Sequence, residues 1–223
     1  MLNEAIKAFR CEELRELMHK EGEDIELVDI RRAADFCEGF IPGSVFLGLT
    51  GQFKEYASAL LHPRRQIILV APEGELEPGL ALLSEAGLAN IAGYVKGGLE
   101  AWKELGDPRD MIINVDAGEM AMDIPFDKNL VVLDVRQRWE FAEGHVQGAV
   151  NLPVAEMKDP LNIAQFDERD NLYLHSAYGY RSVIAASLLK IQGYHNLRNV
   201  TGGWDSIQHT RGIKIEKESA SLN

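Results

Sequence analysis

A short loop between a predicted strand and a predicted helix holds the residues of this sequence that are best placed for chemistry. It runs Ser176-Ala177-Tyr178-Gly179-Tyr180-Arg181-Ser182, after an apolar segment (171–174) and before helix-forming residues (183–191). Such a junction collects backbone N–H groups and the positive end of the helix dipole around one point, which stabilises an anion. The first residue of the loop is placed to act as a nucleophile.

That first residue is Ser176, and a serine hydroxyl needs a general base before it can attack. A cysteine would not, because its pKa of about 8.5 falls by several units at a helix N-terminus. His175 directly precedes Ser176, so in an extended strand its side chain points to the opposite face. We therefore expect His175 to be packed at the strand end and not to serve as the base.

The elements that must position this loop occur twice. Motifs of the first half recur in the second half at an offset of 105 residues: Asp29-Ile30-Arg31 as Asp134-Val135-Arg136, Phe36-x-Glu38-Gly39 as Phe141-x-Glu143-Gly144, and Gly97-Gly98 as Gly202-Gly203. A period of this length is a repeated domain, since solenoid units are shorter. The sequence therefore predicts two domains of one topology.

The order of motifs in the second half resembles the rhodanese-like sulfurtransferases. Asp-x-Arg, Phe-x-x-Gly-His-x-x-Gly-Ala, a strand, a loop ending in Arg-Ser, a helix and Gly-Gly-Trp follow one another in that family's sequence. The family loop is Cys-x-x-Gly-x-Arg-Ser, with the cysteine as sulfur carrier, and this chain matches it except at Ser176. The resemblance implies that Ser176 and Arg181 are the catalytic positions and that the substrate anion is held by Ala177, Tyr178, Gly179, Tyr180 and Ser182.

A narrower resemblance concerns the first half. Its Leu47-Gly48-Leu49-x-Gly51-x-Phe53 segment is similar to the tandem rhodanese portion fused behind metallo-β-lactamase-fold persulfide dioxygenases. The dioxygenase portion itself is not present, because none of the six histidines forms a His-x-His pair. We therefore expect no metal and no cofactor.

Alternating strands and helices predict an α/β fold in which two rhodanese-like domains, 1–110 and 111–223, each have a small parallel sheet with helices on both faces. Strands are expected at 25–28, 67–70, 91–94, 131–133, 171–174 and 196–200. Helices are expected at about 78–86 and 181–191, each closed by a glycine, Gly87 or Gly193. The breaker-rich segment 106–110 is the expected linker, and Asp116 with Glu119 predicts a capping box after it.

The first domain has lost the loop pattern. The offset of 105 residues places Ala71 opposite Ser176 and Leu76 opposite Arg181. Pro72 removes one backbone donor, and three glutamates (73, 75 and 77) bring negative charge to the place of an anion. Acidic residues near a helix start also simply favour the dipole. We expect this domain to be a structural or partner-binding module.

Two further residues of the second domain, Asp134 and Arg136, are expected to support the loop by bonding its backbone and neighbouring carboxylates. Arg181 has two roles open to it: it could orient an anion, or it could tie the loop to an acidic neighbour.

The composition of the chain limits the classes of partner that we expect it to bind. The net charge of −12 argues against a nucleic-acid partner. The charged N-terminal segment 1–20 has no uninterrupted apolar core, so it predicts neither a signal peptide nor a membrane span, and we expect a cytoplasmic protein. The expected ligand is a small sulfur anion such as thiosulfate or a low-molecular-weight persulfide, with a protein sulfur donor or acceptor as a further partner.

Three functions remain open from the sequence. The first is a tandem rhodanese-type sulfurtransferase that is inactive as written, because Ser176 replaces the cysteine. The second is a non-catalytic module that binds a sulfur species, a small anion or a protein partner. The third, a phosphatase-like activity, is the weakest, because by resemblance it needs a cysteine and a loop one residue longer.

Overall fold

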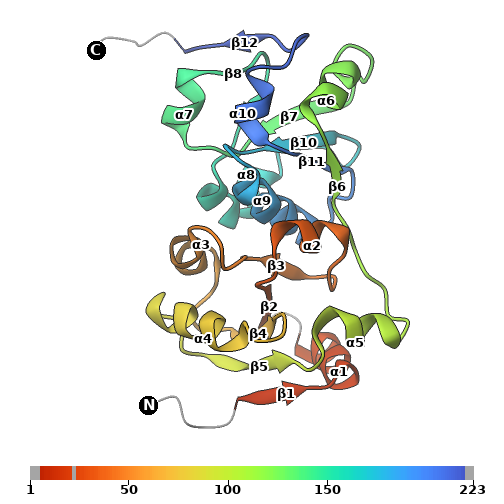
Figure 1. Ribbon diagram of the computed structural model, residues 1–223, viewed down its shortest axis with the longest axis vertical. Coiled ribbons are helices and arrows are strands. Elements are labelled where there is room, and N and C mark those ends of the chain that lie inside the picture. The colour runs from red at the N-terminus through yellow and green to blue at the C-terminus, as the bar shows by residue number, and fades with distance from the viewer. Residues whose placement is uncertain (1–5, 22–23, 219–223) are drawn as a thin grey trace. The chain divides into compact units, whose positions relative to one another are not determined.

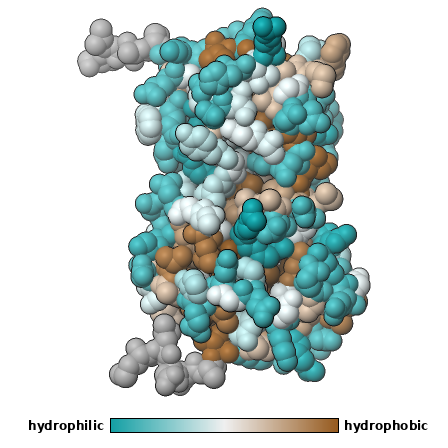
Figure 2. Space-filling view, in the orientation of Figure 1, coloured by the Kyte–Doolittle hydropathy of each residue, from teal (hydrophilic) through white to brown (hydrophobic). Residues whose placement is uncertain are grey.

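The computed structural model describes residues 6–21 and 24–218 (Figure 1). The chain divides between Met111 and Ile112 into two compact units. No helix within the described residues is long and apolar enough to cross a membrane. Residues 1–5 of the charged N-terminal segment lie outside the described residues. Figure 2 shows hydrophilic residues over much of the face in view, with apolar patches between them.

The first unit alternates strands and helices along its whole length. Its elements are β1 (Lys7–Phe9), α1 (Cys11–Glu21), β2 (Ile25–Asp29), α2 (Ala33–Glu38), β3 (Ser44–Phe46), α3 (Phe53–Leu60), β4 (Gln66–Val70), α4 (Leu76–Glu85), β5 (Ile91–Val95) and α5 (Gly98–Glu104). The apolar runs of β2 and β4 are buried nearly throughout, as expected for central strands of a parallel sheet.

The second unit repeats this alternation with additions. Its elements are β6 (Ile113–Val115), α6 (Ala117–Asp123), β7 (Leu130–Asp134), α7 (Arg138–Glu143), β8 (His145–Val146), β9 (Val150–Asn151), the 3₁₀ helix η1 (Val154–Lys158), α8 (Pro160–Ile163), β10 (Asn171–His175), α9 (Tyr180–Ile191), β11 (Leu197–Val200), α10 (Gly203–Ile207) and β12 (Ile215–Glu216). The short strands β8 and β12 pair with each other in an antiparallel way, apart from the main sheet.

The two main sheets have the same topology, which confirms the repeat predicted from the sequence. The first is ordered β1-β5-β4-β2-β3 and the second β6-β11-β10-β7-β9, and every pairing in both is parallel. In each sheet the strand that precedes the loop, β4 or β10, is central. Parallel strands place their carboxyl ends at one edge, so the loops after β7 and β10 meet there.

Helices cover both faces of each sheet, as predicted. In the first unit α1 and α5 pack on one face through a core that includes Leu14, Ile68 and Trp102, and α3 packs beside α4. In the second unit α6 and the start of α10 share a core with Tyr173 and Val200, whereas α9 contacts β10, β11 and η1.

Local signals in the sequence were accurate at most element ends. Asp116 and Glu119 form the predicted capping box at the start of α6, and Gly87 and Gly193 have the positive φ angles expected after α4 and α9. Both loop helices begin before the predicted residues: α4 starts at Leu76 and α9 at Tyr180. The N-cap of α9 is Gly179, which adopts the left-handed conformation and so allows helical geometry to start directly after it.

Candidate functional site

The 176–182 loop lies between the carboxyl end of β10 and the start of α9. Ser176 is almost fully buried, with 1% of its surface exposed. Its Oγ accepts a hydrogen bond of 3.1 Å from the backbone N–H of Gly179. The loop therefore already directs a backbone donor at the position from which a nucleophile or its bound anion would act.

The Gly202–Gly203 turn holds the loop from the side of β11 and α10. The backbone N–H of Trp204 donates to the carbonyl of Ser176 at 2.7 Å. Gly203 has a φ angle of +56°, and a Cβ added there would lie 2.3 Å from that same carbonyl oxygen. Only glycine allows this approach, which gives a physical reason for the second glycine of the motif.

Arg181 forms an ion pair with Glu140 of α7. Its two terminal nitrogens lie 2.5 and 2.8 Å from the two carboxylate oxygens, and both side chains are largely buried. Burial alone would raise the pKa of Glu140, but the hydrogen bonds from Arg181 and from the backbone of Gln137 outweigh it, so the pKa lies below its usual value. Of the two roles open to Arg181, the structure places it in the tie to an acidic neighbour.

The side chain of Ser182 stabilises the start of α9 through hydrogen bonds. Its hydroxyl lies 2.9 Å from the carbonyl oxygen of Gly179 and 2.7 Å from Oδ1 of Asn199. The side-chain amide of Asn199 in turn donates to Asn114 at 2.8 Å. This chain of polar side chains links the loop to β11 and β6.

Asp134 and Arg136 lie beneath the loop, at 0% and 3% exposure. The guanidinium of Arg136 donates to both carboxylate oxygens of Asp134 and to the carbonyl of Gly144. It also lies 4.2 Å from the centre of a Trp204 ring. These contacts join Arg136 to Asp134, Gly144 and Trp204, and the role of Asp134 and Arg136 in supporting the 176–182 loop stays a prediction.

His175 is completely buried, and its Nε2 lies 3.6 Å from a carboxylate oxygen of Asp134. Within the described residues neither ring nitrogen has a hydrogen-bond partner. Burial lowers the pKa of His175, so the ring is neutral at pH 7. The geometry agrees with a packed histidine and offers Ser176 no base.

A groove opens beside the loop. It has a volume of about 530 Å³ and is lined by parts of α7, the loop, α10 and the β12 region: Arg136, Trp139, Glu140, Glu143, Gly144, Ala177, Tyr178, Trp204, Gln208, Ile215 and Lys217. We call it the aromatic groove. Tyr178, at the tip of the loop, is 81% exposed. Tyr180 instead forms the first residue of α9 and is half-buried.

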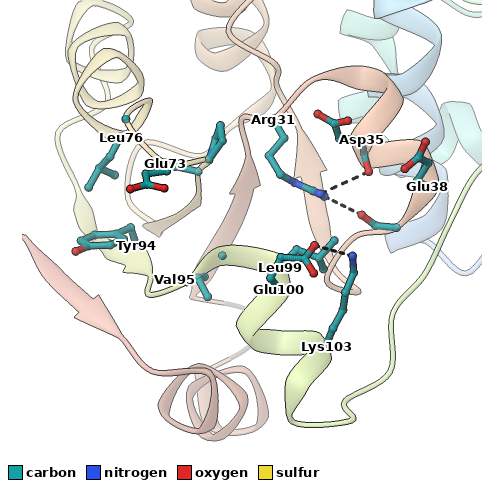
Figure 3. Close-up of a pocket in the computed structure, with 16 residues that line it drawn as sticks. Arg31, Asp35, Glu38, Glu73, Leu76, Tyr94, Val95, Leu99, Glu100 and Lys103 are labelled. Carbon is teal, nitrogen blue, oxygen red and sulfur yellow. Dashed lines mark hydrogen bonds and ion pairs between the residues drawn. The ribbon is translucent and has the colours of Figure 1, made fainter.

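The equivalent pocket of the first unit is larger and acidic. It has a volume of about 710 Å³, and its lining includes Ala71, Pro72 and Leu76 together with Asp35, Glu38, Glu73 and Glu100. Figure 3 shows its two basic side chains turned to partners of their own: Arg31 donates to the Asp35 and Gly39 carbonyls, and Lys103 pairs with Glu100. Arg31 is also paired with the buried Asp29. No cation of this pocket is therefore left for an anion.

Sequence reasoning missed several residues of the second site. It did not identify Glu140, Asn199 or Asn114, which hold the loop, or Trp139 and Ile215, which line the groove. Glu140 could have been found through the repeat, because it aligns with Asp35 beside the first loop. Nothing in the sequence places the distant Ile215 there. Within the described residues, no group of three or more histidine, cysteine or acidic side chains could hold a metal ion.

The sequence matches the family described as "Rhodanese-like domain" twice, over residues 11–105 and 119–210. These two matches cover most of the chain and coincide with the two repeats.

Curated relatives match over one domain. A putative mitochondrial thiosulfate sulfurtransferase of Schizosaccharomyces pombe is 32% identical over 89 residues, which are 35% of this chain and 63% of that protein. A putative sulfur carrier protein of Bacillus subtilis, YrkF, is 35% identical over 34% of this chain and 40% of its own length. The chain thus spans less than two thirds of either relative.

The chain is also similar to solved structures. A thiosulfate sulfurtransferase from Pseudomonas aeruginosa aligns with 96% of this chain and 44% of its own, at 18% identity and a TM-score of 0.43. A rhodanese-related protein of Thermoplasma volcanium aligns with 48% of this chain and 99% of its own, at 26% identity and a TM-score of 0.42.

Proposed function

Because the chain belongs to the rhodanese-like domain family, we propose that its second unit is built for sulfane-sulfur transfer at the 176–182 loop. The observation that carries this proposal is the preserved loop scaffold around a replaced carrier atom. Ser176 Oγ receives the Gly179 N–H, while Arg181, Ser182 and Trp204 fix the surrounding backbone. The first unit keeps the fold without these contacts.

The chemistry requires a thiol at position 176. A cysteine thiolate there would attack the outer sulfur of thiosulfate, forming an S–S bond to the enzyme while the S–S bond of thiosulfate breaks and sulfite leaves with the electron pair. Cyanide would then attack that outer sulfur, release the enzyme thiolate and depart as thiocyanate. The loop N–H groups and the α9 dipole would stabilise the anionic forms.

We propose that the chain, with serine at position 176, does not complete this reaction. Among the described residues the ring of His175, which precedes Ser176, has no hydrogen-bond partner and lies against Asp134, and a serine hydroxyl cannot take up sulfane sulfur as a persulfide. The two cysteines, Cys11 and Cys37, form no disulfide, are buried and lie in the first unit. They offer no substitute thiol at the loop.

Donor and acceptor are proposed from the relatives. Several are called thiosulfate sulfurtransferases and one a sulfur carrier protein, which supports a sulfur anion, a low-molecular-weight persulfide or a protein thiol as partners here. The Leu47–Phe53 motif supports a family relationship between this chain and the tandem rhodanese portions of persulfide dioxygenases.

A second candidate function is a non-catalytic module that binds a small anion or sulfur species. The loop favours it directly, because the stretch from Ala177 to Ser182 contains no proline, so each residue carries a backbone N–H. In this case the scaffold would be kept for binding alone.

The Ser176→Cys variant separates the two functions. We expect this single substitution to let the chain convert thiosulfate and cyanide into thiocyanate, whereas the unaltered chain stays at background. Thiocyanate formation is measured colorimetrically, with Ala71→Cys as the matched control in the first unit. Turnover by the unaltered chain that persists after Cys11 and Cys37 are both replaced would contradict the role given to Ser176. A folded but inactive Ser176→Cys variant would favour the binding module.

A further inference from the structure

The aromatic groove is larger than the site that a small sulfur anion would require. Ala177 and Tyr178 belong to the 176–182 loop and also line the groove, so whatever fills it contacts the loop that begins at Ser176. A volume of about 530 Å³ lies in the range of pockets that hold a whole organic ligand. The groove therefore points to a second, larger reactant besides a thiosulfate-sized one.

Its walls carry the residue types that dominate protein–protein contacts. Trp139 is 65% exposed and Tyr178 is 81% exposed, and Ile215 and Trp204 lie in the same lining. The repeat offset places Ala34, Glu73 and Leu99 at the positions of Trp139, Tyr178 and Trp204 in the first unit. Exposed Trp and Tyr are the residues that most often carry binding energy at interfaces, and only the unit with the intact loop has them here.

The charges of the groove are mostly paired internally. Arg136 is held by Asp134, and Glu140 is held by Arg181. This leaves one acidic and one basic side chain in the lining, Glu143 and Lys217, and neither is in an ion pair among residues 6–21 and 24–218. The groove therefore has no electrostatic field of one sign, so it has to recognise its ligand through van der Waals contact and hydrogen bonds.

One wall of the groove includes Ile215 of β12 and Lys217, which follows this strand. In the described part of the chain β12 pairs only with β8; Figure 1 shows the two side by side, next to α7. Lys214 accepts from Gln147 on the β8 side, and Glu218 donates to Ala142. Because antiparallel ladders alternate, the backbone groups of Ile215 face away from β8. Such an edge is a template for another extended chain.

We propose that the aromatic groove binds an extended polypeptide segment that adds to the free edge of β12, rests on Trp139 and Tyr178, and presents a cysteine to position 176. The partner is thus a protein or peptide thiol. The role of the partner's thiol as a sulfur donor or acceptor rests on the proposed function. The binding of the peptide itself does not require sulfur transfer.

Binding is tested on the unaltered chain with a blocked pentapeptide, acetyl-Ala-Val-Cys-Val-Ala-amide, titrated by NMR. We expect amide shifts in 139–144, 177–178 and 215–217. Trp139→Ala should weaken the peptide affinity at least tenfold, whereas Phe126→Ala should not, since Phe126 is also an exposed aromatic residue of the same unit (86% against 65% for Trp139) but lies outside the groove lining. A peptide N-methylated at alternate residues should lose binding, because it cannot pair with a strand edge.

Any of four results would overturn the inference. Glutathione or N-acetylcysteine binding as tightly as the pentapeptide would show a small-thiol site. Concentration-dependent shifts of the same amides without peptide would show that a second copy of the chain covers the groove. Equal affinity of the N-methylated peptide, or no shifts at millimolar peptide, would remove the strand-edge mode.

Sulfur transfer separates a failure of this inference from a failure of the proposed function. In the Ser176→Cys background, thiosulfate and cyanide test the loop alone. If thiocyanate forms, Trp139→Ala should lower transfer to the pentapeptide relative to transfer to cyanide by at least tenfold. An unchanged ratio would contradict the inference that the groove binds the peptide. Absence of thiocyanate would contradict the proposed function, and the NMR titration alone would then decide whether the groove binds the peptide.

Discussion

Two adjacent residues, His175 and Ser176, show how strongly position decides chemistry. Both are buried, yet they face different surroundings: His175 lies against Asp134 beneath the loop, and Ser176 faces the N–H of Gly179. Alternation along β10 separates the side chains. A histidine next to a serine in sequence is therefore no catalytic pair here.

Burial of His175 predicts a specific pH dependence of stability. Its pKa is lowered by burial, with Asp134 opposing this effect and with Arg136 and Arg181 adding to it. An unfolded histidine binds a proton near pH 6.5, whereas the folded one does so only at lower pH. This group's contribution is therefore complete above about pH 6.5, and the free energy of unfolding falls by up to about 1.4 kcal/mol per pH unit below it.

Urea unfolding between pH 7.5 and 5 measures this slope. We expect it to become shallower in His175→Gln and to remain in His209→Gln, because His209 is exposed. Parallel slopes for the unaltered chain and His175→Gln would show that His175 does not remain neutral in the folded state.

At the scale of elements, the loop is fixed from three directions. The end of β10 leads into it, α9 starts within it at Tyr180, and the turn before α10 bonds its carbonyls. Glycines permit this at two points, Gly179 as the left-handed N-cap and Gly203 at the closest backbone approach. The arrangement preorganises the donors before any ligand arrives.

The Gly203→Ala substitution should disturb the loop as well as the stability. A left-handed alanine costs about 1–2 kcal/mol, and here its Cβ would also collide with the Ser176 carbonyl at 2.3 Å. Gly193→Ala is the matched control, since Gly193 also has a positive φ angle, of +89°, but nothing within 4 Å of an added Cβ.

We expect a larger loss in urea unfolding for Gly203→Ala than for Gly193→Ala, and amide shifts in 176–182 only for the former. Equal losses with an unmoved loop would show that the turn does not support the site.

At the scale of the whole molecule, one fold occurs twice with different pockets. The same strand order supports a loop with Arg181, Ser182 and a Gly-Gly-Trp turn in the second unit, and Ala71, Pro72 and Leu76 in the first. The first pocket gathers carboxylates, as Figure 3 shows for Asp35, Glu38 and Glu73. The same fold therefore carries two loops and two pockets of different chemistry.

This asymmetry predicts where thiosulfate binds. We expect amide shifts at 177–182 and none around Ala71, because Pro72 lacks an N–H and the acidic lining repels anions. Charge at a helix start contributes only about 0.3–1 kcal/mol at exposed positions, so the dissociation constant should be on the order of millimolar. Titration by NMR with chloride as the reference anion measures it, and shifts confined to the first unit would reverse the assignment.

The sequence by itself determined the repeat, the fold class and the loop. These signals are local or periodic: apolar runs of buried strands, the Asp116 capping box, glycines after helices, and motifs spaced by 105 residues. Each depends on a few neighbouring residues, so spacing and residue type suffice to predict it.

Only the tertiary structure decided what surrounds the loop. It paired Arg181 with Glu140, joined Ser182 to Asn199 and Asn114, and brought Ile215 beside Tyr178. These partners come from different strands and helices, and the last lies near the chain's end. Their proximity depends on sheet order and on the β8–β12 pairing, which no local pattern in the sequence encodes.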